Sequence, residues 1–277
     1  MEPRSASFTD PTHTRHRRSC DSFISSTLVL IPALDEAGNV GQVVREWQDL
    51  GAGGVRVVDN GSRDATAREA ADAGAEVLHE PERGYGAACQ RGLASLSPSI
   101  RWVMFSSADG SDVLRREDLP SWNRAIVAGA ALVVGDRTLW PESRRHLKFV
   151  QRAGNTLAAI LLGIGWGHRP RDLGSLRLLS VEALRRLSLR DRTFGWNVEM
   201  HARCAELGLN VVELPVLYRP RRCGNSKISG NVIGTWRAGR TILATLGKLW
   251  WQRPTYRRRN AAADLLAGAT TTPTPYP

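Results

Sequence analysis

Thr27-Leu-Val-Leu-Ile31, followed at once by Pro32-Ala-Leu-Asp-Glu36, is the stretch that decides how the chain begins to fold. A short apolar run that stops at turn residues is typical of a strand buried inside a parallel sheet. The next residues carry apolar side chains at the three- and four-residue spacing of an amphipathic helix, at Val40, Val43, Val44, Trp47 and Leu50. Residues 27–50 therefore predict a strand, a polar loop and a helix.

The same alternation continues along the next hundred residues. Apolar runs predict strands at 55–58, 76–79, 102–105 and 131–134, and helices are expected at 65–73 and 85–96. Strands that alternate with helices are typical of a doubly wound sheet. After residue 135 the order is looser, with a helix near 147–163, a strand near 175–179, a helix near 196–207 and an extended segment at 211–218. The predicted fold class is α/β, a single Rossmann-like mixed sheet flanked by helices.

Composition divides the chain into four parts. Residues 1–25 are rich in Ser, Thr, Pro, Arg and His, lack the apolar core of a signal peptide, and predict a disordered basic arm. Residues 26–230 are expected to form the α/β domain, which is long enough to bury a full core. Residues 231–255 predict an amphipathic helix, and residues 256–277 a flexible tail.

Cysteine and histidine placement argues against a disulfide framework and a zinc site. The four cysteines form no CxxC pair and no ligand-like spacing, which favours a reducing, cytoplasmic setting; they are Cys20, Cys89, Cys204 and Cys223. The six histidines are scattered, without an HExxH arrangement. Zinc chemistry has no support in the sequence.

The net charge of +11 is concentrated near the C-terminus. Between Glu213 and Asp264 there are eleven Lys and Arg and no acidic residue, and the remaining 27 basic residues equal the 27 Asp and Glu of the whole chain. A nucleic-acid patch is disfavoured, because no recognisable DNA- or RNA-binding module surrounds the basic run. The basic run is therefore interpreted either as a solvated surface or as a surface that binds a membrane.

The amphipathic pattern of residues 232–251 has two interpretations. At 100° per residue its apolar side holds Trp236, Ile242, Leu243, Leu246, Leu249 and Trp250, and its basic side holds Arg237, Arg240 and Lys248. Charge interrupts it too often for a membrane span, which needs roughly 20 apolar residues. An interfacial helix at a membrane surface fits the pattern, and so does a helix that packs on its own domain.

Polar blocks follow the carboxyl ends of the first four predicted strands. These blocks are 32–36, 59–64, 80–88 and 107–112. In an open parallel sheet the ligand lies beyond this edge. Turn chemistry alone explains any single Asn-Gly or Asp-Gly, but four blocks in register favour a shared binding site.

The order of these blocks resembles that of family 2 glycosyltransferases of the GT-A fold, in particular dolichyl-phosphate mannosyltransferase-like enzymes. The resemblance covers roughly residues 27–245 and rests on eight motifs: Pro-x-x-Asp-Glu36, Val58-Asp-Asn-Gly-Ser-x-Asp64, Gly84-Tyr-Gly-Ala-Ala88, Ala108-Asp-Gly-Ser-Asp112, Gly135-Asp-Arg137, Asp172-Leu-Gly-Ser-Leu-Arg177, Gly195-Trp-Asn-Val-Glu-Met200 and Arg221-Arg-Cys-Gly-Asn-Ser-Lys227. It implies an inverting transfer of a sugar from a nucleotide-diphosphate donor, UDP- or GDP-linked.

The resemblance and the chemistry of the side chains together give the donor site. Residues expected to bind the nucleotide sugar are Pro32, Ala33, Leu34, Glu36, Asp59, Gly84, Ser107, Ala108 and Asp109. Carboxylates accept N–H groups from a nucleobase edge, which suits Glu36 and Asp59, although Asp59 alternatively caps a turn. Gly84 permits a close backbone approach to a phosphate or sugar.

A divalent cation, Mg²⁺ or Mn²⁺, is implied by the family's Asp-x-Asp element. A hard cation with carboxylate and phosphate ligands neutralises a leaving diphosphate. Asp109 matches the second aspartate and is the expected metal ligand, whereas Ser107 replaces the first. This replacement weakens the prediction of metal dependence.

The remaining site residues are assigned by the resemblance. Acceptor or phosphate contacts are expected at Arg137, Gln151, Arg152, Arg219, Arg221, Ser226 and Lys227, and sugar or acceptor contacts at Asp172, Trp196 and Glu199. The catalytic set is Asp109, Arg137 and Lys227. The basic side chains of this group suit the stabilisation of a diphosphate or an anionic lipid head.

The predicted function is sugar transfer to polyprenyl phosphate at the inner face of the membrane or in the cytoplasm. A phosphate acceptor is already ionised near neutral pH, so it needs no general base. One alternative is transfer to a glycan or small-molecule hydroxyl, with Glu199 or Asp172 as base. Another is a catalytically silent nucleotide-sugar-binding protein, because of Ser107. The oligomeric state and the sugar are left open.

Overall fold

The computed structural model describes residues 23–223 and 239–253. Residues 1–22 of the predicted arm, the predicted tail, and the site residues Ser226 and Lys227 lie outside the described residues. The prediction of a disordered arm up to residue 25 is wrong at its end, because Phe23 and Ile24 are buried in the core and residues 24–26 form a short helix. The first part of the chain follows the expected alternation. Its elements are η1 (Ile24–Ser26), β1 (Thr27–Ala33), α2 (Val40–Asp49), β2 (Gly54–Asp59), α3 (Thr66–Asp72), β3 (Glu76–His79), α4 (Tyr85–Leu93) and β4 (Trp102–Phe105).

The second part is also close to expectation. Its elements are β5 (Asp112–Val113), η2 (Arg116–Asp118), α5 (Leu119–Val127), β6 (Leu132–Asp136), α6 (Pro141–His146), α7 (Phe149–Trp166), β7 (Arg177–Ser180), α8 (Val181–Leu187), α9 (Trp196–Glu206), β8 (Val211–Pro215) and β9 (Leu217–Tyr218). The expected extended segment 211–218 is split into β8 and β9, which belong to different sheets.

The main sheet has seven strands in the order β3-β2-β1-β4-β7-β6-β8. The strands β3, β2, β1 and β4 pair in parallel, and β6 and β8 also pair in parallel. The strand β7 runs antiparallel to both of its neighbours, β4 and β6. A separate two-stranded ribbon joins β5 to β9, a feature too short for the sequence pattern to predict. The mixed α/β fold is therefore confirmed.

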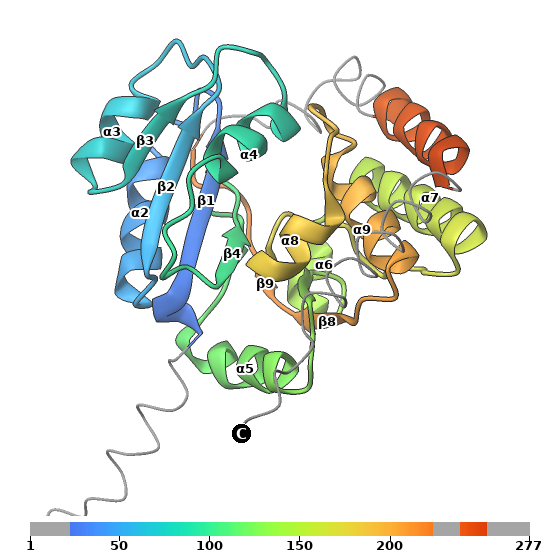
Figure 1. Ribbon diagram of the computed structural model, residues 1–277. Helices are drawn as coiled ribbons and strands as arrows, with labels where there is room; N and C mark the ends of the chain where they lie inside the picture. The colour runs from blue at the N-terminus through green and yellow to red at the C-terminus, as the bar shows by residue number, and fades with distance from the viewer. Residues whose placement is uncertain (1–22, 224–238, 254–277) are drawn as a thin grey trace, which may run out of the picture.

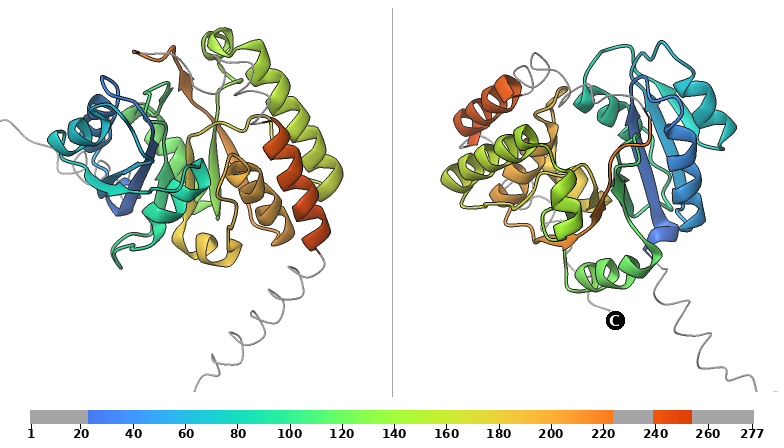
Figure 2. Two further views of the ribbon diagram at one scale, coloured as in Figure 1. Left: turned by 90° about the horizontal axis from the view of Figure 1, so that it is seen from above. Right: turned by 180° about the vertical axis from the view of Figure 1, so that it is seen from behind.

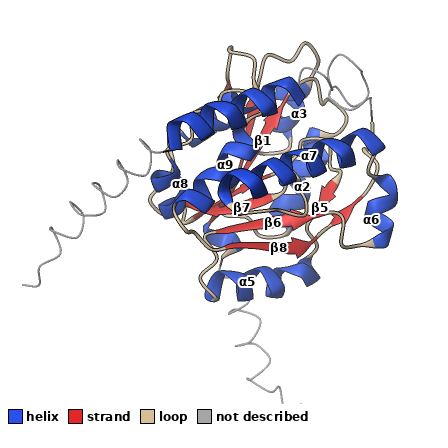
Figure 3. Ribbon diagram, turned by 90° about the vertical axis from the view of Figure 1, so that its right-hand side faces the viewer, coloured by secondary structure: helices blue, strands red, loops and turns tan. Residues whose placement is uncertain are grey.

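Helices cover both faces of the sheet (Figures 1 and 3). Alternate strand residues point to opposite faces, so Val29 and Ile31 join one core cluster and Leu30 joins another. The first cluster contains side chains of α2, α3 and α5, and the second contains side chains of α4, α8 and α9. This arrangement leaves the carboxyl ends of β1, β2 and β3 uncovered by helices and available to polar loops.

Residues 239–253 are helical and lie beside α7 and α9 (Figure 2). Leu246 and Leu249 are buried in a third apolar cluster with residues of those two helices. The packing alternative is therefore confirmed for the described part of the segment, whereas Trp236 and Arg237 lie outside the described residues. Its exposed positions leave the interfacial alternative open as well, since Leu243, Trp250 and Trp251 face solvent. Among the described helices, none is long and apolar enough to cross a membrane.

Candidate functional site

The polar loops beyond β1, β2 and β3 are joined to one another at one edge of the sheet. Strand register places Ala33 beside Asp59, and Asp59 beside His79. The backbone N–H of Asp35 donates to Ser62 Oγ at 2.8 Å, which ties the first loop to the second. The prediction that these blocks share one edge is confirmed.

Asn60 joins the second loop to residues 80–84, which precede α4 and are called the glycine loop below. Its Nδ2 donates to the carbonyl oxygens of Glu80 at 3.0 Å and Glu82 at 2.7 Å, and its Oδ1 accepts from the N–H of Gly84 at 2.8 Å. A side chain that uses both ends of its amide fixes a loop firmly. Sequence reasoning did not single out Asn60, although it lies inside the quoted Val-Asp-Asn-Gly motif.

Asp59 is buried at the end of β2. Its Oδ1 accepts from the N–H of Ser62 at 3.2 Å, and its Oδ2 lies 3.3 Å from His79 Nδ1. The first contact is the turn-capping role that the sequence left open. Recognition of a nucleobase by Asp59 stays a prediction, and it would use the Oδ2 side that faces the exposed imidazole of His79.

Asp109 lies in the loop between β4 and β5, beside Arg221. Its Oδ1 accepts from the N–H of Ser111 at 3.0 Å and from Ser111 Oγ at 2.7 Å, and its Oδ2 is 3.6 Å from Arg221 Nη2. The Oγ of Ser107 is buried, without a hydrogen-bond partner in the part of the chain that the structure describes. These oxygens have the chemistry that Mg²⁺ or Mn²⁺ prefers.

A cation here would need ligands in addition to Asp109 and Ser107. Within residues 23–223 and 239–253 there is no group of three or more His, Cys, Asp and Glu that could hold a metal ion. Asp109 offers one carboxylate, and Ser107 Oγ offers one neutral oxygen. Asp109 and Ser107 therefore fit a cation that is shared with further oxygen ligands such as those of a diphosphate.

Arginines from the segment after β9 connect three parts of this edge. Arg221 Nη2 donates to both carboxylate oxygens of Glu36 at 2.7 Å. Arg219 Nε donates to the carbonyl oxygen of Gly110 at 3.0 Å. Arg219 and Arg222 also pair with Glu46 of α2. The predicted phosphate contacts Arg219 and Arg221 are thus paired with protein carboxylates in this structure.

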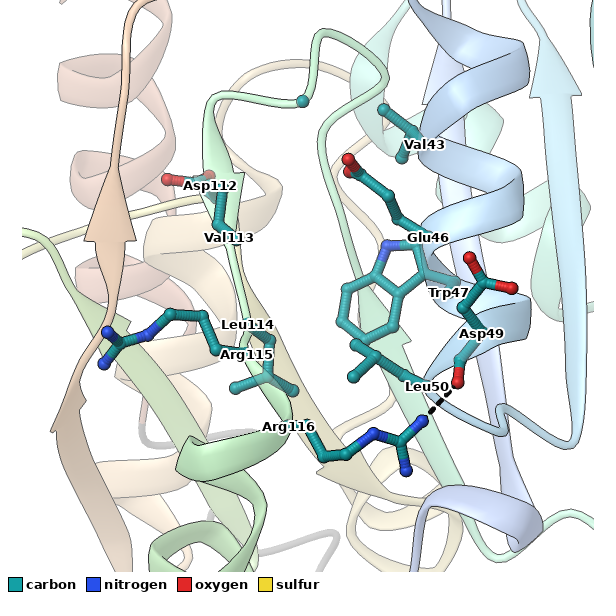
Figure 4. A pocket seen from close by; sticks show the side chains of 11 residues that line it. Val43, Glu46, Trp47, Asp49, Leu50, Asp112, Val113, Leu114, Arg115 and Arg116 are labelled. Carbon is teal, nitrogen blue, oxygen red and sulfur yellow. Dashed lines mark hydrogen bonds between the residues drawn. The ribbon is translucent and has the colours of Figure 1, made fainter.

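Glu46 also borders a pocket between α2 and the segment around β5 (Figure 4). Val43 and Trp47 of α2 and Leu50 directly after it supply apolar side chains, and Arg116 donates to the backbone oxygen of Asp49 across the pocket. Gly110 and Asp112 also line this pocket, so it adjoins the Asp109 loop. Sequence reasoning missed Glu46, because a charged residue on an exposed helix face carries no distinguishing signal.

Arg137 and Asp172 form a buried bidentate ion pair. Arg137 Nε donates to Asp172 Oδ2 at 2.7 Å, and Arg137 Nη2 donates to Asp172 Oδ1 at 2.8 Å. Burial alone raises the pKa of Asp172, but the Arg137 guanidinium outweighs it and holds that pKa below its usual range. Arg137 also lies over the ring of Tyr218, 5.2 Å from its centroid. Gln151 bonds to Tyr218 as well, whereas Arg152 is exposed on α7.

Asp112 and Arg177 add two further buried charges near this pair. Asp112 accepts a hydrogen bond from Ser175 Oγ, and its other oxygen has no partner among the described residues. Burial raises the pKa of Asp112, although the charge of Arg137 opposes this shift. Arg177 donates to the carbonyl oxygen of Leu173 at 2.8 Å and is completely buried. The sequence signal for Arg177 was a cation inside an otherwise apolar strand.

Glu199 and Trp196 lie on α9 and are both buried. Glu199 Oε2 accepts the backbone N–H groups of Arg190 at 2.9 Å and Asp191 at 2.7 Å. Burial raises the pKa of Glu199. Trp196 packs edge-on against Phe105 with ring centroids 6.4 Å apart. Their predicted contact with a sugar or acceptor stays a prediction, and the contacts seen here support the loop and the core.

Curated relatives of this chain are glycosyltransferases. An uncharacterised glycosyltransferase of Mycobacterium tuberculosis is 38% identical over 180 residues, which cover 65% of this chain and 79% of the relative. The undecaprenyl-phosphate mannosyltransferase of Micrococcus luteus is 30% identical over 227 residues, covering 75% of this chain and 89% of the relative.

Solved structures share the fold. Glucosyl-3-phosphoglycerate synthase from Mycobacterium tuberculosis, in complex with Mn²⁺, UDP and phosphoglyceric acid, matches with a TM-score of 0.63 at 21% identity. That match covers 83% of this chain and 82% of the synthase chain. The model of "Glycosyl transferase family 2" matches residues 29–188. The match spans more than half of the chain and includes the strand-end loops and the Arg137–Asp172 pair, so this protein is a transferase that belongs to glycosyl transferase family 2.

Proposed function

We propose that this enzyme transfers a sugar from a UDP- or GDP-sugar to the phosphate of a polyprenyl phosphate. The observation that carries the proposal is how the structure holds Asp172 and Glu199, the two carboxylates that the sequence suggests as a general base. Asp172 is held by Arg137, and Glu199 is held by two backbone N–H groups. Both carboxylates thus have partners inside the protein, whereas a phosphate acceptor needs no proton removed.

On the donor side, the joined loops supply the nucleotide-sugar contacts. Glu36, Asp59 and the backbone of Pro32, Ala33 and Leu34 would bind the nucleoside, and Gly84 would approach the sugar or diphosphate. Ser107, Ala108 and Asp109 would lie along the diphosphate. The register of β1 and β2 supports this division, because it brings Ala33 and Asp59 side by side.

A cation would bind between Asp109 and the donor diphosphate. Solved relatives of the same fold bind Mn²⁺ or Mg²⁺ together with UDP. A bound divalent cation would neutralise the charge that develops on the leaving diphosphate. Arg221 already lies 3.6 Å from Asp109 Oδ2 and would hold that carboxylate in place or contact the diphosphate itself.

On the acceptor side, Arg137 is the central residue. It is fixed by Asp172 and by the Tyr218 ring, and Gln151 bonds to the same tyrosine. These residues would orient the acceptor phosphate, with Arg152 and Arg219 as further cations. Ser226 and Lys227, expected in the same role, lie outside the described residues. The catalytic set proposed is Asp109, Arg137 and Lys227.

A lipid acceptor requires the enzyme to reach a membrane surface. The helix α7 and residues 239–253 lie side by side, with Trp166 and Trp250 ring centroids 5.9 Å apart. Both carry exposed apolar side chains, at Phe149, Val150, Leu157, Ile160, Ile164, Leu243, Trp250 and Trp251. Basic residues accompany them, at Lys148, Arg152, Arg240 and Lys248. This combination supports peripheral binding to an anionic membrane.

Transfer itself is tested with labelled UDP- and GDP-sugars, with and without polyprenyl phosphate. We expect a labelled lipid product that requires both the acceptor and one of the donors. A product formed only on a glycan or small-molecule hydroxyl would contradict the lipid acceptor. No turnover or donor hydrolysis with any donor or cation, combined with retained nucleotide binding, would identify a silent binding protein instead.

Membrane binding is tested by co-sedimentation with vesicles of phosphatidylglycerol and phosphatidylcholine. Trp251→Glu and Phe149→Glu should weaken binding, because each places a charge on the surface that enters the lipid. Val127→Glu is the matched control, since Val127 is 79% exposed but lies on α5, away from α7. Equal binding by all three variants would contradict the proposed membrane surface.

A further inference from the structure

The loop between α8 and α9 is bonded to the first turn of α4, directly after the glycine loop at the donor edge. The N–H of Gly86 donates to the carbonyl oxygen of Thr193 at 3.1 Å, and the N–H of Ala87 donates to that of Arg192 at 2.9 Å. These N–H groups belong to the first turn of α4, which has no intrahelical partner for them. The start of α4 is therefore completed by residues more than a hundred positions later in the chain.

The contact between the two loops is close enough to need glycine. A Cβ atom on Gly84 would overlap the carbonyl oxygen of Arg192, and one on Gly86 would overlap the carbonyl oxygen of Asp191. Gly84 also has φ +157, a region that side chains rarely adopt. A shift of the α8–α9 loop would consequently move the glycine loop with it.

Asp191 holds the α8–α9 loop in shape. Its Oδ1 accepts from the N–H and from the Oγ1 of Thr193, each at 2.7 Å. Its own N–H donates to Glu199 Oε2 at 2.7 Å. A carboxylate that accepts two hydrogen bonds from one residue fixes the turn between them.

The other oxygen of Asp191 is bonded to the C-terminal helical segment. Thr245 Oγ1 donates to Asp191 Oδ2 at 2.7 Å. Thr245 is buried, and a Cβ atom on Gly195 would overlap both its hydroxyl and the Asp191 carboxylate. The contact is thus tightly packed, and Asp191 is bonded to the helix on one side and to its own loop on the other.

This chain of contacts joins the surface with exposed tryptophans to the donor loop. Leu246 and Leu249 seat residues 239–253 on α7 and α9, while Trp250 and Trp251 remain exposed on the same segment. Figure 2 shows this segment, in red, beside α7 and α9. Any interaction that holds residues 239–253 more firmly against α7 and α9 also favours the Thr245–Asp191 hydrogen bond.

We propose that Asp191 is a positioning residue for donor binding, and that seating residues 239–253 on a lipid surface tightens donor binding through the Thr245–Asp191 bond. The inference rests on the proposed transfer function and adds a coupling between the membrane surface and the donor. Asp191 acts through the backbone of Arg192 and Thr193, whose carbonyl oxygens accept the N–H groups of Ala87 and Gly86 at the start of α4.

The test compares Thr245→Val with Thr245→Ser in the full chain. Valine keeps the shape of threonine and removes the hydroxyl, whereas serine keeps the hydroxyl. We expect Thr245→Val to raise the donor KM about tenfold, the equivalent of one hydrogen bond to a charged group, with kcat at saturating donor close to that of the parent protein. Thr245→Ser should keep the parent KM. A second variant, Gly195→Ala, should raise the donor KM in the same way, since it separates the same two side chains.

Vesicles of phosphatidylglycerol and phosphatidylcholine provide the second readout. They should lower the donor KM of the parent protein and of Thr245→Ser, but not that of Thr245→Val. Equal donor KM for the valine and serine variants, or an equal response of both to vesicles, would overturn the inference. Calorimetric titration with UDP and GDP distinguishes a failure of this inference from a failure of the proposed function. If the parent protein binds neither nucleotide, the proposed function is wrong.

Discussion

Arg137 and Arg221 both pair with carboxylates of the site, but their surroundings differ. Arg137 makes two parallel bonds to Asp172, which also accepts from the backbone N–H of Arg137 and from Asn155. Arg221 uses one nitrogen, Nη2, for Glu36 and lies 3.6 Å from Asp109. Its Nε has no partner among the described residues.

The difference separates a fixed pair from an exchangeable one. A buried bidentate pair is costly to break, because each charge would be left alone in a poorly solvated place. Arg221 is only slightly more exposed than Arg137, at 16% against 10%, but it uses a single nitrogen for its carboxylates and loses less when a phosphate oxygen replaces one of them. We therefore expect Arg137 to act as a preformed anion contact and Arg221 to exchange partners when the donor binds.

The largest expected effect comes from breaking the buried pair. Asp172→Asn leaves Arg137 without its counter-charge and should lower the free energy of unfolding by about 3–5 kcal/mol, as for other buried pairs that lose one partner. Denaturant unfolding measures this change. Glu46→Gln is the matched control, because its side chain is 40% exposed and its ion pairs with Arg219 and Arg222 should contribute only about 0–1 kcal/mol. Similar losses in both variants would show that burial does not distinguish the two regions.

Asp109→Ala should affect turnover rather than stability. Removing the carboxylate proposed to hold the cation at the diphosphate should reduce kcat by about 100- to 1000-fold, the usual cost of one group that stabilises developing charge. Glu117→Ala, at an exposed carboxylate that pairs with Arg115, should leave kcat unchanged. Full activity in excess chelator would remove the metal assignment and leave Arg219 and Arg221 to neutralise the diphosphate.

Ser107→Asp should increase the affinity of the Asp109 loop for a divalent cation. A second carboxylate beside Asp109 adds ligand charge, and cation affinity follows ligand charge and count. We expect the Mn²⁺ or Mg²⁺ concentration for half-maximal rate to fall by about tenfold, roughly 1.4 kcal/mol. Ser107→Asn, which adds a neutral oxygen ligand of the same size, should give a smaller change. An unchanged cation requirement in both variants would place the cation elsewhere.

The smallest expected effect is the acid dependence of stability. The folded-state pKa of Asp172 lies below its unfolded value, so its contribution is present above the unfolded pKa and is lost as pH falls through the folded pKa. The slope for one proton is at most about 1.4 kcal/mol per pH unit. Stability of the parent protein, followed below about pH 4, should fall more steeply than that of Asp172→Asn. Parallel curves would mean that Asp172 does not titrate differently on folding.

Local pattern was enough for the first half of the fold. Apolar runs at 27–31 and 102–105 predicted β1 and β4, and the polar blocks after the strands predicted their meeting at one edge. The antiparallel insertion of β7 between β4 and β6 was not predicted, since strand direction depends on how the chain returns to the sheet. The β5–β9 ribbon also escaped prediction, because it pairs only two residues on each side.

The sequence predicted some residues of the candidate site but not the contacts between residues far apart in the chain. Asp59, Asp109 and the glycine loop could be assigned from the sequence, because each lies within a few residues of a strand end. The Thr245–Asp191 bond and the Glu46 pairs could not, since their partners are 54 and more than 170 residues apart in the chain. Periodicity carries no information about such partners.

The sequence by itself determined which side chains the strand ends present, because apolar runs and turn residues act over a few positions. The tertiary structure alone decided what those side chains touch. The sequence alone suggested either Asp172 or Glu199 as a base. In the folded chain Asp172 is the counter-charge of Arg137, and Glu199 accepts hydrogen bonds from two backbone N–H groups. The physical reason is burial: a carboxylate withdrawn from water must be paired or hydrogen-bonded, and only the folded chain supplies the partner.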